Sequence, residues 1–303
     1  MPRRILRVPR YLQIVARRFV WRLVRRAKDP AQYQAAAQRF LDRLPFEYEV
    51  LTKVGEARTA SLNRQLAWSM AFVAGAVNAG GFLAVAHYTS HMTGVASQMG
   101  DAGAVADYGV LLTALGMMIF FMAGAFASTV LVALGKRRGI RGRYAFSLLA
   151  ESGLLLLFGY MGARLQAHDV LDLELTVAVA LLCFIMGMHN AVTTNISGAQ
   201  VRTTHMTGNV TDIGIELAKL AYYNTARRGD TPKIMADRSK LKLVGLLLIS
   251  FLVGGVVGAL GFKHLGFKTV VPLAGFMCFL AARPALLELR LLIRRLRRDF
   301  PEG

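Results

Sequence analysis

The chain has 303 residues, 54% of them hydrophobic, and a mean hydropathy of +0.42. This excludes an ordinary soluble protein, because the charge is concentrated in the first 66 residues, a few loops and the C-terminus, with long apolar blocks between. The formal net charge of +19 does not indicate a nucleic-acid partner, since the basic clusters border apolar blocks, where Lys and Arg set membrane topology. Composition therefore predicts an all-α integral membrane protein.

Residues 1–66 form a basic N-terminal region. Every charged side chain before Asp29 is Lys or Arg, and apolar residues recur at helical spacing: Ile5, Val8, Leu12, Val15, Phe19 and Leu23. This pattern predicts an amphipathic helix on a membrane surface, with anionic lipid as a partner. A disordered basic tail is the alternative, and an Arg-rich start also resembles an organelle transit peptide. We expect a bacterial inner membrane as the location.

Apolar blocks long enough to cross a bilayer follow. There are six of them: 67–87, 109–134, 144–163, 173–196, 241–262 and 268–288. Because Lys and Arg stay on the cytoplasmic side, the basic loop 135–143 is expected inside and the acidic loop 101–108 outside. The same rule places both termini, including the basic tail 289–303, in the cytoplasm. The strongly charged loops agree only if two short segments, 89–101 and 203–222, do not cross completely.

The motif His-Met-Thr-Gly occurs twice, at 91–94 and 205–208, and marks an internal repeat. Three further pairs align around it: Gly75 with Gly187, Phe121 with Phe251, and Gly124 with Gly254. Each half reads span, broken segment, span, span, which gives membrane repeat 1 (67–163) and membrane repeat 2 (173–288). An odd number of crossings separates matching points. The predicted fold therefore has six transmembrane helices, arranged as a 3+3 inverted repeat with two broken half-helices.

The two broken segments are candidate binding elements. A Thr hydroxyl can cap the new helix, Gly permits close approach, and a helix N-terminus attracts anions. The candidate substrate-binding residues are Asn78, Thr93, Gly94, Asn190, Thr207, Gly208 and Asn209. Two structural alternatives stay open: the Thr-Gly pairs cap breaks that pack on each other, and the asparagines join helices as polar contacts.

Four short stretches carry a family resemblance: "AGAVNAGGF", "SHMTG", "GMHNA" and "VRTTHMTG". Together they resemble the YoaK family of membrane proteins, over most of residues 66–288. The resemblance implies about six spans and no established activity. The chain departs from relatives at Val95, where they often have Asn, at Asn78, where an acid is common, and at His189, where Gln is common. A role for that acid would be lost or moved here.

Titratable residues inside apolar segments are candidates for proton coupling. We select His91, His205, Asp212 and Glu151. The histidines have an alternative role as partners of neighbouring carbonyl groups. Glu151 requires a partner or a proton, and Arg283 in the last span is the candidate partner. His87 and His91 have the i, i+4 spacing of a metal-binding pair, but Val201 stands in place of His87 in the second repeat, and two ligands are too few. We therefore expect neither a metal site nor a cofactor.

The preferred functional hypothesis is a secondary transporter, not an enzyme, for a small anionic or zwitterionic solute bound at the paired breaks. One alternative is a membrane-embedded, lipid-modifying enzyme that uses Asp212, Glu216 and Lys219. The other is a non-catalytic scaffold or sensor that docks through residues 1–60. A homo-oligomer is compatible with each hypothesis.

Overall fold

The computed structural model describes residues 48–54, 59–85, 87–140, 142–165, 172–225 and 235–299. They all belong to one compact unit, Phe46–Gly303, whereas residues 1–45 form a separate unit. The amphipathic helix predicted near the N-terminus lies outside the described residues. Those residues contain helices and no strand, which confirms the all-α class.

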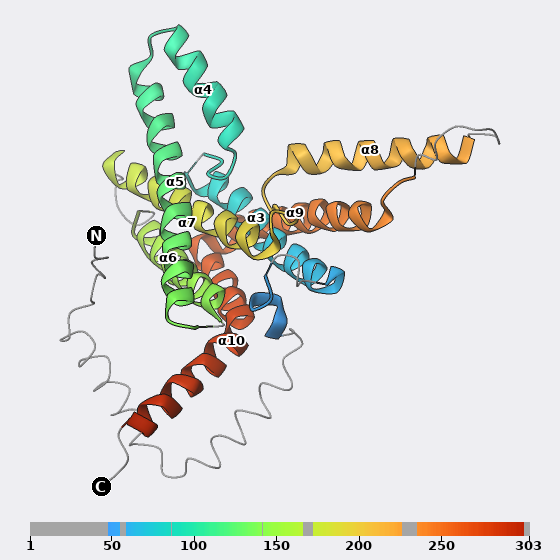
Figure 1. Ribbon diagram of the computed structural model, residues 1–303. Helices are drawn as coiled ribbons and strands as arrows, with labels where there is room; N and C mark the ends of the chain where they lie inside the picture. Colours follow the sequence, from blue (N-terminus) through green and yellow to red (C-terminus); the bar gives the residue numbers. More distant parts are fainter. Residues whose placement is uncertain are drawn as a thin grey trace, which may run out of the picture. The chain divides into compact units, whose positions relative to one another are not determined.

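Eight α-helices and two 3-10 helices make up the described part (Figure 1). The α-helices are α3 (Ala60–Val85), α4 (Met92–Ala104), α5 (Tyr108–Arg137), α6 (Arg143–Leu165), α7 (Asp172–Ser197), α8 (Met206–Thr225), α9 (Arg238–Leu265) and α10 (Val270–Asp299). The 3-10 helices are η1 (Tyr48–Leu51) and η3 (Gly266–Thr269). The predicted tail 289–303 is thus largely a continuation of α10.

Four stretches of the described residues are long and apolar enough to cross a membrane. They are Tyr108–Arg137, Arg143–Arg164, Leu175–Ser197 and Arg238–Ala282, the last of which contains α9 and the start of α10. These apolar helices are those of an integral membrane protein. α3 is not among the four stretches, and the number of six spans stays a prediction.

Two helix pairs from opposite halves of the chain pack closely: α3 with α9, and α5 with α7. At both crossings a glycine faces a backbone carbonyl of the partner so closely that a Cβ would overlap it. The contacts are Gly75 with Phe251, Gly254 with Phe72, Gly187 with Phe121, and Gly124 with Phe184. Small residues allow such backbone approach in membrane helices. The aligned glycines of the sequence therefore occupy matching positions in two crossings.

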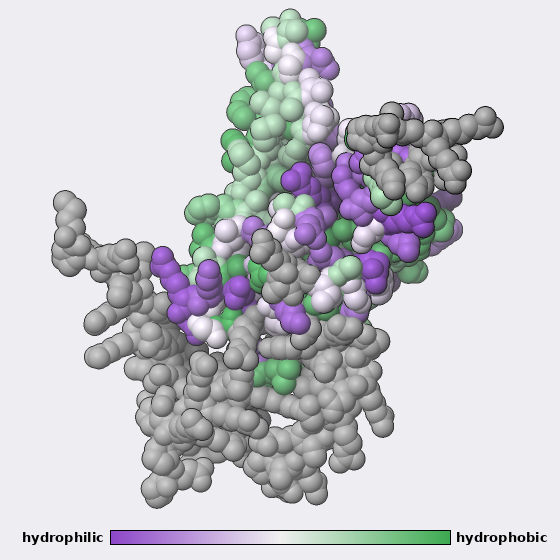
Figure 2. All heavy atoms as spheres, turned by 45° about the vertical axis from the view of Figure 1, so that its right-hand side comes forward, coloured by the Kyte–Doolittle hydropathy of each residue, from purple (hydrophilic) through white to green (hydrophobic). Residues whose placement is uncertain are grey.

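The remaining helices pack on this framework. α6 packs on α10 and on α7, α4 lies along α5, and α8 lies along α9 (Figure 1). The buried core includes Met70 of α3, Leu148 of α6, Leu182 of α7 and Met277 of α10. Hydrophobic residues cover much of the α4–α5 pair, whereas hydrophilic residues gather beside the α8–α9 pair (Figure 2).

An aspartate caps the N-terminus of the second helix in each of the pairs α4–α5 and α8–α9. Asp107 precedes α5, and its carboxylate accepts from the Val110 backbone N–H at 3.1 Å. Asp237 precedes α9 and accepts from the N–H groups of Ser239 and Lys240, both at 2.9 Å. Each carboxylate satisfies helix N–H groups that lack an internal partner, which fixes where the helix starts.

Candidate functional site

The two breaks precede α4 and α8, and the predicted threonine caps are wrong. The carbonyl groups of His91 and His205 accept the first helical bonds, from Val95 at 3.1 Å and Asn209 at 3.0 Å. His91 is therefore the N-cap of α4, without a side-chain cap bond. The reason is position: Thr93 and its counterpart Thr207 follow the first helical residue, so their hydroxyls lie beyond the cap, on the exposed surface.

The glycine of each motif makes room for the histidine three residues before it. A Cβ on Gly94 would lie 3.0 Å from Nδ1 of His91, and one on Gly208 would overlap the ring of His205. The His-Met-Thr-Gly motif thus lets an imidazole lie over the first turn of a helix. The close neighbour of each glycine in the structure is this ring.

The asparagines Asn78 and Asn190 hold the two breaks through matching hydrogen bonds. Ser90 Oγ donates to Asn78 Oδ1 at 2.7 Å, and Thr204 Oγ1 donates to Asn190 Oδ1 at 2.6 Å. Each bond ties the last turns of α3 or α7 to the loop that follows. This contact is the one expected if the asparagines serve as polar connections.

Replacing Thr204 by Val is expected to loosen the second break. The substitution keeps the shape but removes the O–H donor to Asn190, which costs about 0.5–1.5 kcal/mol. Hydrogen exchange of the backbone amides at 198–205 should accelerate by about two- to tenfold if the loop opens locally. Thr211→Val, whose hydroxyl donates only to the Thr207 carbonyl within α8, is the matched control and should leave this exchange unchanged.

A buried hydroxyl without a hydrogen-bond partner occurs at the same place in both breaks. Thr89 and Thr203 each lie two residues before the histidine and are fully buried, and neither Oγ1 has a hydrogen-bond partner among the described residues. A buried polar atom of this kind is costly unless something polar reaches it. The two breaks thus share an unsatisfied buried hydroxyl, which is a further match between the repeats.

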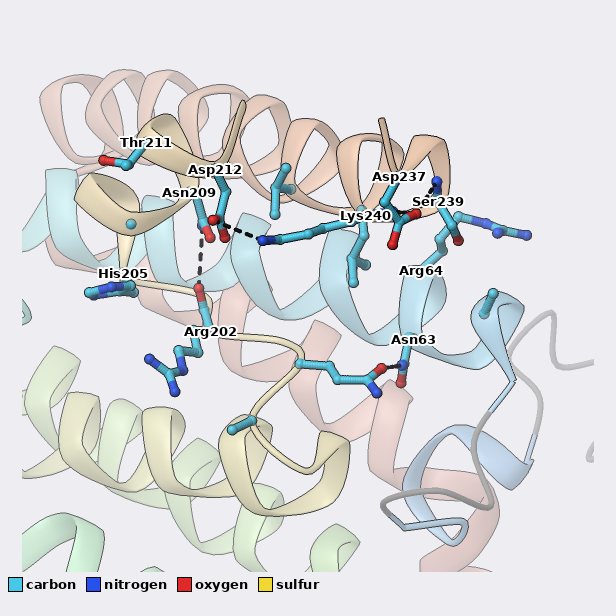
Figure 3. A pocket seen from close by; sticks show the side chains of 16 residues that line it. Asn63, Arg64, Arg202, His205, Asn209, Thr211, Asp212, Asp237, Ser239 and Lys240 are labelled. Carbon is cyan, nitrogen blue, oxygen red and sulfur yellow. Dashed lines mark hydrogen bonds and ion pairs between the residues drawn. The ribbon is translucent and has the colours of Figure 1, made fainter. Parts of the chain in front are cut away.

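A cavity of about 730 Å³ opens beside the second break, between α3, α8 and α9 (Figure 3). Four of the predicted site residues line it: His205, Gly208, Asn209 and Asp212. Its lining does not include Thr207, Asn190 or Glu151, nor the first-repeat residues Asn78, His91, Thr93 and Gly94. The structure thus brings together the second-repeat candidates and leaves the first-repeat candidates apart from them.

Positive charge exceeds negative charge by one in the lining, with His205 neutral. The cations are Arg64, Arg202 and Lys240, and the acids are Asp212 and Asp237. Lys240 donates to Asp212 at 2.9 Å, which joins α9 to α8. Among the described residues, the guanidinium groups of Arg64 and Arg202 contact no carboxylate within ion-pair distance (Figure 3). These two groups are available to an anion.

Asn209, Asp212 and Glu216 lie on the face of α8 that packs towards α9, as their spacing predicts. Glu216 is buried and accepts from Lys219 Nζ at 2.8 Å and from the Asp237 backbone N–H at 2.7 Å. The hydrogen bond from Lys219 and then that from Asp237 lower the pKa of Glu216 below its usual 4.5. The acids considered for a lipid-modifying enzyme are therefore engaged in holding α8 on α9.

The first break lacks the charged side chains that surround the second break. Val95 is buried where the second repeat has Asn209, and the exposed Gln98 stands where it has Asp212. The two breaks thus share their backbone arrangement and differ in the charge of their side chains.

Glu151 has a partner that the sequence analysis did not select. Its Oε1 lies 2.7 Å from Nδ1 of His189, and both side chains are 1% exposed. The other imidazole nitrogen, Nε2, lies 3.0 Å from the Met70 carbonyl oxygen. Arg283 was the expected partner, and its side chain lies outside the described residues. A carboxyl inside an apolar segment needs a polar partner, and this rule alone could have pointed to the histidine on α7.

Apolar helices that pack around a few buried polar contacts define this molecule as a helical integral membrane protein. Residues 66–283 match the model of a family described as "Protein of unknown function (DUF1275)", and the chain belongs to that family. This agrees with the resemblance to the YoaK proteins. No curated protein and no solved structure matches the chain. The described residues contain no group of three or more His, Cys, Asp or Glu side chains that could hold a metal ion.

Proposed function

We propose that this protein is a secondary transporter, not an enzyme, and that it moves a small anionic or zwitterionic solute across the membrane. The observation that carries the proposal is the cavity beside the second break. Its lining combines the N-terminus of α8, the buried amide of Asn209 and two exposed arginines, Arg64 and Arg202, that pair with no carboxylate of the described residues. Helix N-termini and Arg side chains both favour carboxylate and phosphate groups.

The packing supports the proposed 3+3 inverted repeat. If α3, α4, α5 and α6 are equated with α7, α8, α9 and α10, the pairing of α3 with α9 becomes that of α7 with α5. The glycine contacts, the aspartate caps, the asparagine bonds and the unpartnered threonine hydroxyls all follow the same correspondence. In such transporters broken helices bind the solute near the bilayer midplane. In the described structure the cavity lies at the second break alone.

Gly109 and Ser239 offer a direct test of the inversion. Both are exposed, and both lie two residues after the capping aspartate of their helix. Single cysteines at these positions, in a protein lacking Cys183 and Cys278, should react with a membrane-impermeant thiol reagent from opposite sides: Gly109→Cys from outside and Ser239→Cys from the cytoplasm. Reaction of both from one side would rule out the inverted arrangement.

Neutralising an unpaired guanidinium should weaken solute binding. Because a hydrogen bond to a charged group contributes about 1.5–3 kcal/mol, Arg202→Gln is expected to raise the KM for transport by about tenfold or more. The assay is uptake into vesicles of the purified protein, with acetate, succinate, glycine and inorganic phosphate as probes. Arg138→Gln, an exposed position outside the cavity, is the control and should transport normally. An unchanged KM in Arg202→Gln for a transported probe would remove Arg202 from the site.

We place the protein in a bacterial inner membrane with both termini in the cytoplasm and with anionic lipid at the basic N-terminal region. Deleting residues 1–45 should then leave transport largely intact while reducing affinity for anionic vesicles. Loss of all function on this deletion, with the helical core still folded, would favour the scaffold hypothesis. Turnover of a labelled lipid that is abolished by Asp212→Asn would favour the enzyme.

A further inference from the structure

We infer that Glu151 and His189 together form a buried binding site for one exchangeable proton, which is released only when α6 separates from α3 and α7. The inference adds to the proposed transporter by assigning the site of its coupling proton. Only the role of the proton in coupling rests on the proposed transport function; the binding of the proton does not. It moves the coupling site away from the exposed His91 and His205 and into the helix core.

Two contacts of His189 fix the number of protons that the pair holds. The Met70 carbonyl can only accept, so the 3.0 Å contact requires a hydrogen on Nε2 of His189. The 2.7 Å contact between Nδ1 and Glu151 Oε1 then requires a second hydrogen between these two atoms. It lies either on the imidazole, as an ion pair, or on the carboxyl, as a neutral pair. In both forms the pair holds one proton that it can exchange with solvent.

Loss of this proton is incompatible with the packed structure. A carboxylate and the lone pair of Nδ1 would then face each other at hydrogen-bond distance, with both side chains 1% exposed. Glu151 Oε2 is also buried, and no side chain or backbone group of the described residues forms a hydrogen bond with it that would spread the charge. Because an uncompensated buried charge is strongly destabilising, water must reach the carboxylate first. The three groups come from α3, α6 and α7, so water enters only if these helices part.

The surrounding helices contribute no other described charge to the pair. α3 has no titratable side chain between Arg64 and His87, and α7 contributes the thiol of Cys183. On α10, the thiol of Cys278 contacts Ser152, the neighbour of Glu151, at 3.0 Å. Thiols are largely uncharged near neutral pH. On α6 itself, the nearest titratable side chain is that of Tyr144, about two turns away.

Spectroscopy of the full-length protein in lipid vesicles tests the site without any transport substrate. The protein carries ¹³C-labelled glutamate carboxyl groups and ¹⁵N-labelled histidine. Infrared difference spectra report a protonated carboxyl, and nitrogen chemical shifts report Nδ1 as the pH is raised. We expect a transition of the pair with one shared midpoint, which Glu151→Gln and His189→Gln each abolish. Glu216→Gln and His205→Gln are matched controls and should keep it.

Two results would overturn the proton site. One is the absence of any such transition over the pH range in which the protein stays folded, which would make the pair a permanent structural contact. The other is separate midpoints for the two residues, each unaffected by substitution of the other. If Glu151→Gln does not fold, Glu151→Asp keeps a carboxyl at the site. In that variant the labelled band should disappear and an unlabelled one should replace it.

The reactivity of Cys183 tests the coupling to helix separation. This thiol is fully buried in α7, and Cys278→Ser removes the other cysteine. Through the same pH transition, reaction with a small thiol reagent should rise at least about tenfold more in the Cys278→Ser protein than in the same protein carrying Glu151→Gln. Equal pH profiles would refute the separation of helices. A spectroscopic transition without any solute transport would instead refute the transporter and leave the proton site standing.

Discussion

Replacing Gly124 by alanine is expected to destabilise the folded protein by at least about 3 kcal/mol. A Cβ at this position would overlap the backbone carbonyl of Phe184, in the centre of the α5–α7 crossing. A side chain can move to another rotamer, but a backbone carbonyl within a helix cannot move without shifting the helix. The two helices must therefore part, and the contacts on both sides of the crossing weaken. Gly254→Ala should behave alike, since its Cβ would overlap the Phe72 carbonyl in the α3–α9 crossing.

The same helices provide matched controls. Gly116 in α5 and Gly245 in α9 have open space where a Cβ would be added. Alanine there is expected to be neutral or to stabilise by roughly 0.5–1 kcal/mol, because glycine is the poorer helix former. The measurement is the temperature at which each purified variant loses its monodisperse state in detergent. Equal stability of the Gly124→Ala and Gly116→Ala proteins would show that the crossing is looser than described.

Replacing His189 by leucine should destabilise the protein by about 3–5 kcal/mol at neutral pH, because it leaves the buried Glu151 carboxyl without its partner. Leucine fills similar space, so the loss reflects the unpaired group and the freed Met70 carbonyl more than a cavity. Removing the carboxyl as well should recover part of the loss, since well-packed apolar residues replace buried polar pairs at little cost.

A double-mutant cycle separates these effects. Stability is compared for the original protein, His189→Leu, Glu151→Leu and the double variant. We expect the double variant to be more stable than His189→Leu alone. His205→Leu, which changes an exposed histidine, is the control and should alter stability by less than about 0.5 kcal/mol. Additive effects in the cycle would mean that Glu151 and His189 do not depend on each other.

Much of this architecture could be predicted from the hydrophobic periodicity and the internal repeat of the sequence. The alignment of Gly75 with Gly187 and of Gly124 with Gly254 anticipated contacts that recur in two crossings. This worked because close backbone approach demands glycine wherever it occurs, so that matching contacts leave matching residues. The break before each motif was predictable because the residues that shape it occur twice in the sequence.

Other features depend on three-dimensional neighbours, and the sequence could not supply them. The partner of Glu151 is set by how far α7 is rotated, and the sequence predicted Arg283, whereas the structure brings His189 to Glu151. The threonine caps were misplaced because a helix start is decided within one residue, and here the carbonyl of His91 makes the first bond. The cavity beside α8 needs Arg64 from α3, which no spacing argument connects to the second break.

The exchange of partners between the two halves has a consequence for how the protein is made. α3 is synthesised early, yet the helix that covers its glycine face, α9, emerges only after α8. During translation the closest packing surface of α3 therefore stays unmatched until α9 has been made. Folding can be completed only when the second half has been made. In a chain truncated before α9, the glycine face of α3 stays exposed and can associate with other helices. Such a fragment is a natural substrate for membrane quality control, and the two halves co-expressed as separate chains should protect each other from degradation.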